Sequence, residues 1–127
     1  MAERSARGFS GRALIIEDDA VIALDLQEML ECRGFGPVEI AYTAEAAERC
    51  AAQTYSVAIV DIKLASGTSI VAARLLQNNG TPLIVTTGYE DGLAADFANV
   101  TVLVKPFEEE RLGEALDSTL KLAPPTR

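Results

Sequence analysis

The stretch Ser56-Val57-Ala58-Ile59-Val60-Asp61 decides the fold of this chain. Four apolar residues run without a polar break and end at a carboxylate, a pattern typical of a strand buried on both faces of a parallel sheet. Asp61 would then lie at the carboxyl end of a central strand, where open α/β sheets bind their ligands. A carboxylate there can ligate a metal, act as a base or attack phosphorus. It can also simply cap the next element.

Four further apolar runs alternate with segments of helical character. The runs are residues 13–16, 38–41, 83–85 and 100–104, and the helical segments are residues 20–33, 44–52, 69–78 and 108–122. Residues 62–68 have the composition of a loop, and residues 89–99 make only a poor helix. Asp19 and Thr43 are candidate N-caps, and Gly34 is a candidate helix stop. This alternation predicts an α/β fold with parallel strands, right-handed crossovers and helices on both faces of the sheet.

Composition places the chain among small globular domains. Its 127 residues predict one domain at 12–122, with a flexible N-terminal arm at 1–11 and a C-terminal tail at 123–127. A net charge of −8 argues against direct nucleic-acid binding and against a polybasic membrane anchor. We find no apolar run long enough to span a membrane and no secretory signal. Two cysteines without a paired spacing suit the cytoplasm, and the absence of histidine argues against zinc sites.

Chemically capable residues stand at the ends of four of the predicted strands. Residues 17–19 (Glu-Asp-Asp) end the first strand, and Asp61, Thr87 and Lys105 end the third, fourth and fifth. In a parallel sheet these ends share one edge, so carboxylates, a hydroxyl and an ammonium should converge there. Oxygen-only acidic clusters suit a hard cation such as Mg²⁺. Lys105 could hold a phosphoryl oxygen, so this set suits phosphoryl transfer to or from a carboxylate.

Each of these features also has an ordinary structural explanation. Three adjacent acids often mark only a solvated helix start, a threonine at a strand end is commonly a cap, and Lys-Pro after a strand is a common loop opening. The joint occurrence at successive strand ends favours function over those separate explanations.

With these pieces in place, the chain resembles a response-regulator receiver domain of two-component signalling over roughly residues 12–122. The matching motifs are IIEDD, VAIVDIKL, LIVTTG and VLVKPF, in the family's order. The resemblance implies a (βα)5 flavodoxin-like doubly wound sheet with strand order 2-1-3-4-5. It further implies that a sensor histidine kinase or a histidine phosphotransfer protein phosphorylates Asp61.

The resemblance also implies a role for each of the other matching residues. Asp18 would ligate Mg²⁺, or Mn²⁺ or Ca²⁺ in its place, with Glu17 as its partner acid and Asp61 and the main-chain carbonyl of Lys63 as further ligands. Thr87 would be the switch hydroxyl and Lys105 the phosphate-binding lysine. Asp19 falls outside this set, and we expect it to cap a helix.

Several positions depart from the family's pattern. Val102 stands where an aromatic residue is common three positions before the lysine, and Ala65 stands where proline is common. Seventeen residues separate Thr87 from Lys105, which is short for the family and predicts a short fourth helix. Residues 85–89 partly match the motif of the atypical FATGUY receivers, which tend to be linked with kinases of the HWE/HisKA2 type. Without the aromatic, we expect phosphorylation to order residues 88–99.

We therefore expect a stand-alone, monomeric receiver that is not a classical enzyme. It would signal by phosphorylation-dependent protein–protein interaction or act as a phosphate shuttle or sink, and its cognate kinase and target are not identified. One alternative is a pseudo-receiver that binds partners without phosphorylation, although the matched residue set argues against it. Another is an aspartate-nucleophile phosphatase. That class needs a second acid two residues after the nucleophile, where this chain has Lys63.

Overall fold

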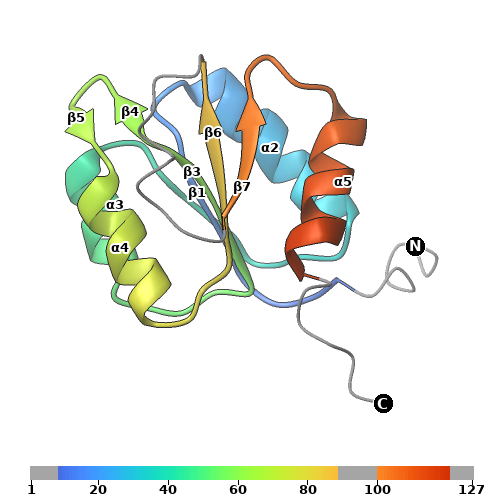
Figure 1. Ribbon diagram of the computed structural model, residues 1–127, viewed down its shortest axis with the longest axis horizontal. Coiled ribbons are helices and arrows are strands. Elements are labelled where there is room, and N and C mark those ends of the chain that lie inside the picture. The colour runs from blue at the N-terminus through green and yellow to red at the C-terminus, as the bar shows by residue number, and fades with distance from the viewer. Residues whose placement is uncertain (1–8, 89–99, 121–127) are drawn as a thin grey trace.

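A five-stranded parallel sheet forms the centre of the protein (Figure 1). The computed structural model describes residues 9–88 and 100–120. The sheet comprises β1 (Ala13–Ile16), β2 (Val38–Ala41), β3 (Val57–Asp61), β6 (Leu83–Thr87) and β7 (Thr101–Val104). Their order is β2-β1-β3-β6-β7, and every neighbouring pair is parallel. Counted among the sheet strands alone, this is the predicted order 2-1-3-4-5, so the fold-class prediction is confirmed.

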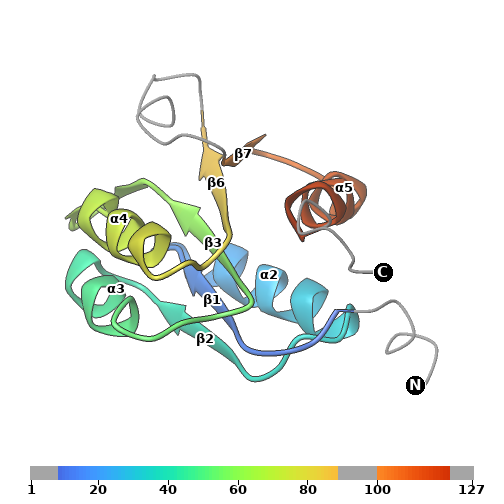
Figure 2. The ribbon, with the colours of Figure 1, turned by 60° about the horizontal axis from the view of Figure 1, so that its bottom comes forward.

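The central strand β3 is buried on both faces, as its unbroken apolar run predicts. Ile59 pairs with Ile15 on β1 and with Ile84 on β6, and all three side chains are at most 1% exposed. Two layers of helices cover the sheet (Figure 2): α2 (Ala20–Cys32) and α5 (Glu109–Leu120) on one face, and α3 (Ala44–Cys50) and α4 (Ile70–Asn78) on the other. Burying apolar side chains against both layers stabilises the sheet from each side.

Local sequence signals set the bounds of the helices next to the site. The Asp19 side chain accepts hydrogen bonds from the backbone N–H groups of Val21 and Ile22, which confirms it as the N-cap of α2. At the other end Gly34 has a φ of +112°, and the Gly34 and Phe35 N–H groups donate to carbonyls of the last turn. This is a Schellman motif, which favours glycine because its left-handed conformation strains other residues. The Thr43 side chain caps α3 as expected.

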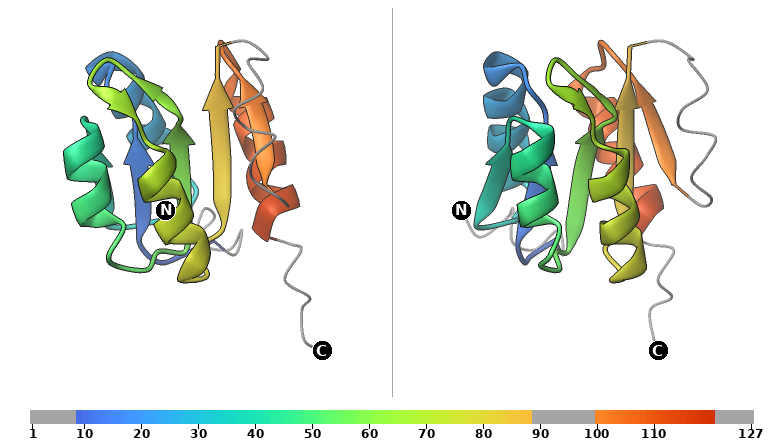
Figure 3. Two further views of the ribbon diagram at one scale, coloured as in Figure 1. Left: turned by 60° about the vertical axis from the view of Figure 1, so that its left-hand side comes forward. Right: turned by 90° about the vertical axis from the view of Figure 1, so that its left-hand side faces the viewer.

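The segment after Asp61 differs from its prediction. Residues 62–68, expected to be a loop, contain two short antiparallel strands, β4 (Lys63–Leu64) and β5 (Gly67–Thr68). The resulting hairpin (yellow-green in Figure 3) stands at the edge of the sheet where β1 and β3 end. Strands of two residues are too short for alternation of apolar and polar residues to reveal them.

The packed core extends to the first described residue. Phe9, which we expected in the flexible arm, stacks on Phe35 with ring centroids 5.3 Å apart and packs against the α2–α5 side of the core. Residues 1–8, the tail at 123–127 and the expected short fourth helix at 89–99 lie outside the described residues. Within the ranges that are described, no helix has the length and apolarity needed to cross a membrane.

Candidate functional site

Strand alternation places the side chains of Glu17, Asp61 and Lys105 on the same face of the sheet. Ile16 pairs with Val60, so Glu17 and Asp61 come next on adjacent strands. Both alternate with residues that pack under α2 and α5, and Lys105 alternates with Leu103 in the same way. The three charged groups therefore share one face of the sheet at its carboxyl edge.

Lys105 joins the two acids. Its Nζ donates to Asp61 Oδ2 at 2.9 Å and to Glu17 Oε1 at 3.1 Å. Glu17 is 2% exposed and Asp61 6% exposed, so one ammonium serves two carboxylates that are largely shielded from water. The other oxygen of Glu17 accepts from the Asp19 N–H at 3.1 Å, which fixes the orientation of this carboxylate. Buried charges are tolerated only when they are paired in this manner.

The pKa values of Glu17 and Lys105 are both raised, for different reasons. Burial raises the pKa of Glu17 above its ordinary value, and this outweighs the lowering by its hydrogen bonds with Asp19 and Lys105. Burial alone would lower the pKa of Lys105. Hydrogen bonds and charges from Asp61 and Glu17 together outweigh burial, so the pKa of Lys105 is raised and the ammonium stays charged.

Three carboxylates form a cluster that suits a divalent cation. One oxygen each from Glu17, Asp18 and Asp61 lies within 4.8 Å of the others. All donors are oxygens, which is the chemistry that Mg²⁺, Mn²⁺ and Ca²⁺ prefer. The residues present therefore fit the expected cation. Lys63 opens β4, two residues beyond Asp61, and its main-chain carbonyl remains a predicted ligand.

Asp18 is held by a contact that the sequence did not reveal. The backbone N–H of Ala65 donates to Asp18 Oδ2 at 2.5 Å, across 47 positions of the chain. In the sequence, Ala65 differs from the common family pattern only by replacing a proline, and no periodic pattern connects it with Asp18.

Thr87 reaches the same edge but stands one residue beyond the partner of Asp61. Asp61 pairs with Thr86, whereas Thr87 pairs with Val104 and its carbonyl accepts from the Lys105 N–H at 2.7 Å. By strand alternation Thr86, 2% exposed, shares the sheet face of Asp61, and Thr87 does not. The predicted switch role of Thr87 therefore remains a prediction.

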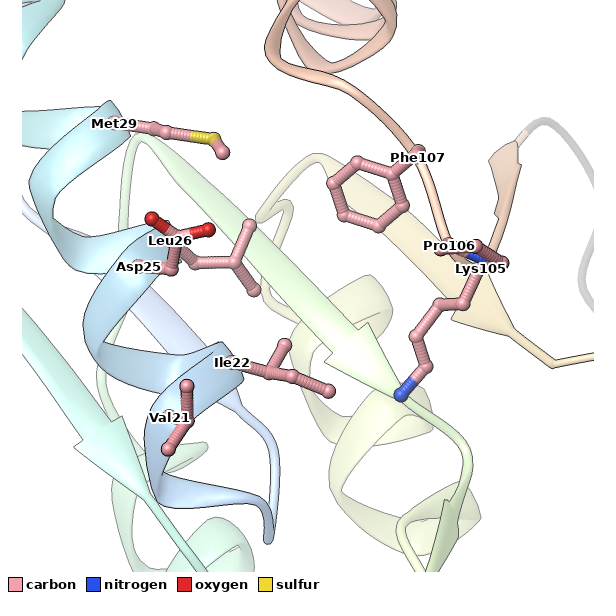
Figure 4. A pocket seen from close by; sticks show the side chains of 8 residues that line it. All are labelled: Val21, Ile22, Asp25, Leu26, Met29, Lys105, Pro106 and Phe107. Carbon is pink, nitrogen blue, oxygen red and sulfur yellow. The ribbon is translucent and has the colours of Figure 1, made fainter.

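A groove beside the site was not foreseen. It has a volume of about 430 Å³, and its lining is mostly apolar. In Figure 4, Phe107 faces Leu26 across it, and Lys105 lies at one end. The lining comes from α2 and from the segment after β7: Val21, Ile22, Asp25, Leu26, Met29, Lys105, Pro106 and Phe107. Val21 is 77% exposed, so an apolar surface lies beside Lys105, the residue that contacts Asp61.

A five-stranded parallel sheet between two layers of helices, with carboxylates, a threonine and a lysine at its carboxyl edge, is the arrangement expected of a receiver domain. Residues 13–117 match the response regulator receiver domain family, and the chain belongs to that family of two-component signal transduction.

The chain is similar to several regulators in particular. It is 31% identical over 113 residues to the phyllosphere-induced regulator PhyR of Methylorubrum extorquens, covering 84% of this chain and 42% of that protein. It is 25% identical to the transcriptional regulatory protein FixJ of Bradyrhizobium diazoefficiens, covering 91% of this chain and 59% of that one. This chain thus spans about half the length of these relatives.

Solved structures agree with the family. The response regulator PhyR from Brucella abortus has a TM-score of 0.79 and 27% identity, covering 95% of this chain and 52% of that one. TrrA from Thermotoga maritima, solved with Mg²⁺ and BeF, has a TM-score of 0.72 at 22% identity, covering 86% of this chain and 98% of that one. The latter supports the fold alone.

Proposed function

We propose that this receiver accepts a phosphoryl group on Asp61 from a sensor histidine kinase or a histidine phosphotransfer protein, in a reaction that requires Mg²⁺. The observation that carries the proposal is the contact of Lys105 Nζ with Asp61 Oδ2 at 2.9 Å, inside a cluster that also contains Glu17 and Asp18. One lysine and two further acids around a buried carboxylate suit the capture of a phosphoryl group.

In the proposed step a carboxylate oxygen of Asp61 attacks phosphorus. The new O–P bond forms while the donor's N–P bond breaks, and the donor nitrogen keeps the electron pair. Lys105 exchanges its contact with Asp61 for one with a phosphoryl oxygen, so its positive charge stabilises the negative charge of the incoming phosphoryl group. A bound Mg²⁺ would neutralise negative charge shared by the acids and the phosphoryl oxygens. The protein modifies itself in this step, so we do not class it as an enzyme.

The groove beside Lys105 supports a kinase as the donor. Its apolar wall along α2 faces Lys105, which contacts Asp61, so a helical partner seated there could present a phosphohistidine to Asp61. The partial FATGUY motif supports a kinase of the HWE/HisKA2 type. The two cysteines, which have no paired spacing, support a cytoplasmic location.

The output that we propose is a phosphorylation-dependent protein–protein interaction, or a shuttle or sink for phosphoryl groups, by a monomer. PhyR from Bartonella quintana, which is 27% identical and described as an anti-anti-sigma factor, supports a protein target. Val102 is 45% exposed on β7, so no buried aromatic can report the state of Asp61 from that position. The segment expected to respond instead, residues 88–99, lies almost wholly outside the described residues.

One assay tests the proposal. The full chain is incubated with acetyl phosphate and Mg²⁺, and its intact mass is measured. We expect an acid-stable, base-labile adduct of one phosphoryl group that EDTA prevents and that Asp61→Asn abolishes. Asp117→Asn, an exposed acid on α5, is the matched control and should keep the adduct.

Two outcomes would contradict the proposal. A wild-type chain that gains no adduct would favour the pseudo-receiver. Turnover of a general phosphomonoester, with loss of that turnover in Asp61→Asn, would favour the phosphatase.

A further inference from the structure

Asp18 differs from the other acids of the cluster in what holds it. Lys105 Nζ bonds to Glu17 and to Asp61, and in the described part of the chain it forms no ion pair with Asp18. The partner of Asp18 is neutral: the Ala65 N–H donates to Oδ2 at 2.5 Å. The orientation of the predicted Mg²⁺ ligand therefore depends on the backbone of the β4–β5 hairpin.

The hairpin is well placed to hold that carboxylate because it is itself anchored on both sides. The Ser66 Oγ, next to Ala65, accepts from the Ala44 N–H of α3 at 3.1 Å. Beyond β5, the Ser69 Oγ donates to the main-chain carbonyl of Asp61 at 2.7 Å. The Ala65 amide is thus fixed relative to the acceptor strand as well as to Asp18.

We propose that the main-chain N–H of Ala65 is a positioning group for the cation site, an inference that rests on the proposed function. A carboxylate has two oxygens, so a bond from Ala65 to Oδ2 orients Asp18 and leaves Oδ1 for the cation. Hydrogen bonds from outside the ligand shell commonly orient metal-binding side chains in this way. Proline, which is common among receivers at this position, has no N–H and could not donate this hydrogen bond. The bond therefore depends on the alanine that this chain has in place of proline.

A pair of variants tests the inference. Ala65→Pro removes the donor, whereas Ala65→Gly keeps it and serves as the control. Mg²⁺ affinity of the full, EDTA-treated chain is measured by calorimetry without any phosphoryl donor. We expect Ala65→Pro to bind Mg²⁺ about 10- to 100-fold more weakly, the usual cost of losing such a partner. Ala65→Gly, which spares the Asp18 contact, should bind nearly as well as the wild type.

A second measurement does not depend on the proline variant folding. In the wild-type chain, the Ala65 amide proton should stay downfield and protected from exchange when Mg²⁺ is added, because the bond to Oδ2 persists. Exposure of this amide on Mg²⁺ addition would overturn the inference, as the bond would then compete with the cation. Folded Ala65→Pro with equal or tighter Mg²⁺ binding would overturn it too, as would an equal loss in Ala65→Gly.

Different results would contradict the proposed function and the positioning role of Ala65. If the wild type binds Mg²⁺ but gains no phosphoryl group, the proposed function falls and the positioning role of Ala65 stands. If the wild type is phosphorylated and Ala65→Pro binds Mg²⁺ normally, only the inference falls. If the wild type binds no Mg²⁺, both fall.

Discussion

Glu17 is the residue whose ionisation connects the site most directly to stability. Its carboxylate is 2% exposed and shares Lys105 with Asp61, and burial raises its pKa above 4.5. A raised pKa means that the folded state holds the proton more tightly than the unfolded state does. The native chain therefore binds more protons between the two pKa values, and stability falls as pH rises through that window.

We predict that Glu17→Gln flattens this fall. In urea unfolding without divalent cations, wild-type stability should decrease from about pH 4.5 upwards, and the variant should lose part of that slope. Lys105 should not add to this slope. Its pKa is raised above 10.5, so the lysine stays protonated and its contribution to stability stays constant at every pH below 10.5. Exposed Glu48→Gln should retain the wild-type slope, and an unchanged slope in Glu17→Gln would contradict the prediction.

The two threonines at the end of β6 permit a test of the switch hydroxyl. We predict that Thr87→Ala still accepts the phosphoryl group but loses most of the amide shifts that beryllofluoride with Mg²⁺ induces in residues 100–105. Thr86→Val, which removes the hydroxyl on the Asp61 face at nearly constant volume, should keep those shifts. The opposite result would transfer the role to Thr86.

At the scale of elements, the exposed start of α2 is the surface where we expect a kinase to dock. Val21 is 77% exposed beside the groove, and Val71, also the second residue of its helix, is 54% exposed on the opposite layer. Both side chains are largely exposed to solvent, so replacing either with a charge should leave folding intact.

We predict that Val21→Asp slows phosphotransfer from the cognate kinase by about tenfold, the cost of roughly 1.4 kcal/mol at an interface hot spot. Acetyl phosphate should still label the variant at the wild-type rate, since the chemistry at Asp61 is untouched. Val71→Asp is the matched control and should behave as the wild type in both assays. Slow labelling by acetyl phosphate would place the effect on the acceptor rather than on docking.

At the scale of the whole molecule, the chain carries a net charge of −8 and gathers three carboxylates at one edge of the sheet. Their mutual repulsion opposes folding, and one lysine offsets only part of it. A cation bound to the cluster in the folded state should therefore stabilise the entire domain, since unfolding disperses the three acids.

We predict that Mg²⁺ at a hundred times its dissociation constant raises the unfolding free energy by about 2.7 kcal/mol. EDTA should reverse the gain, and Asp18→Asn should lose most of it, whereas Asp117→Asn should keep it. Thermal unfolding with and without Mg²⁺ measures this difference. An equal gain in Asp18→Asn would indicate general screening of charge rather than a site.

Much of the fold and of the candidate site was predictable because it rests on local patterns. Unbroken apolar runs such as residues 57–60 indicated doubly buried strands. Asp19 and Thr43 marked helix starts by their capping side chains, and Gly34 marked a helix end by its left-handed backbone. Polar residues directly after those strands had to meet at one edge once the strands were parallel. Residues 62–68 were predicted less well, because a two-residue ladder leaves no periodicity to read.

The amino-acid sequence by itself thus predicted the five strands and the meeting of Glu17, Asp18, Asp61 and Lys105 at their carboxyl edge, and its resemblance to the family supplied the strand order. Only the tertiary structure decided which oxygens Lys105 joins, that Thr86 rather than Thr87 shares the face of Asp61, and that Ala65 holds Asp18. The physical reason is the separation along the chain of the residues that interact. Alternation and capping act over a few residues, whereas the Ala65 and Lys105 contacts join residues 44 to 88 positions apart and exist only after the chain has packed.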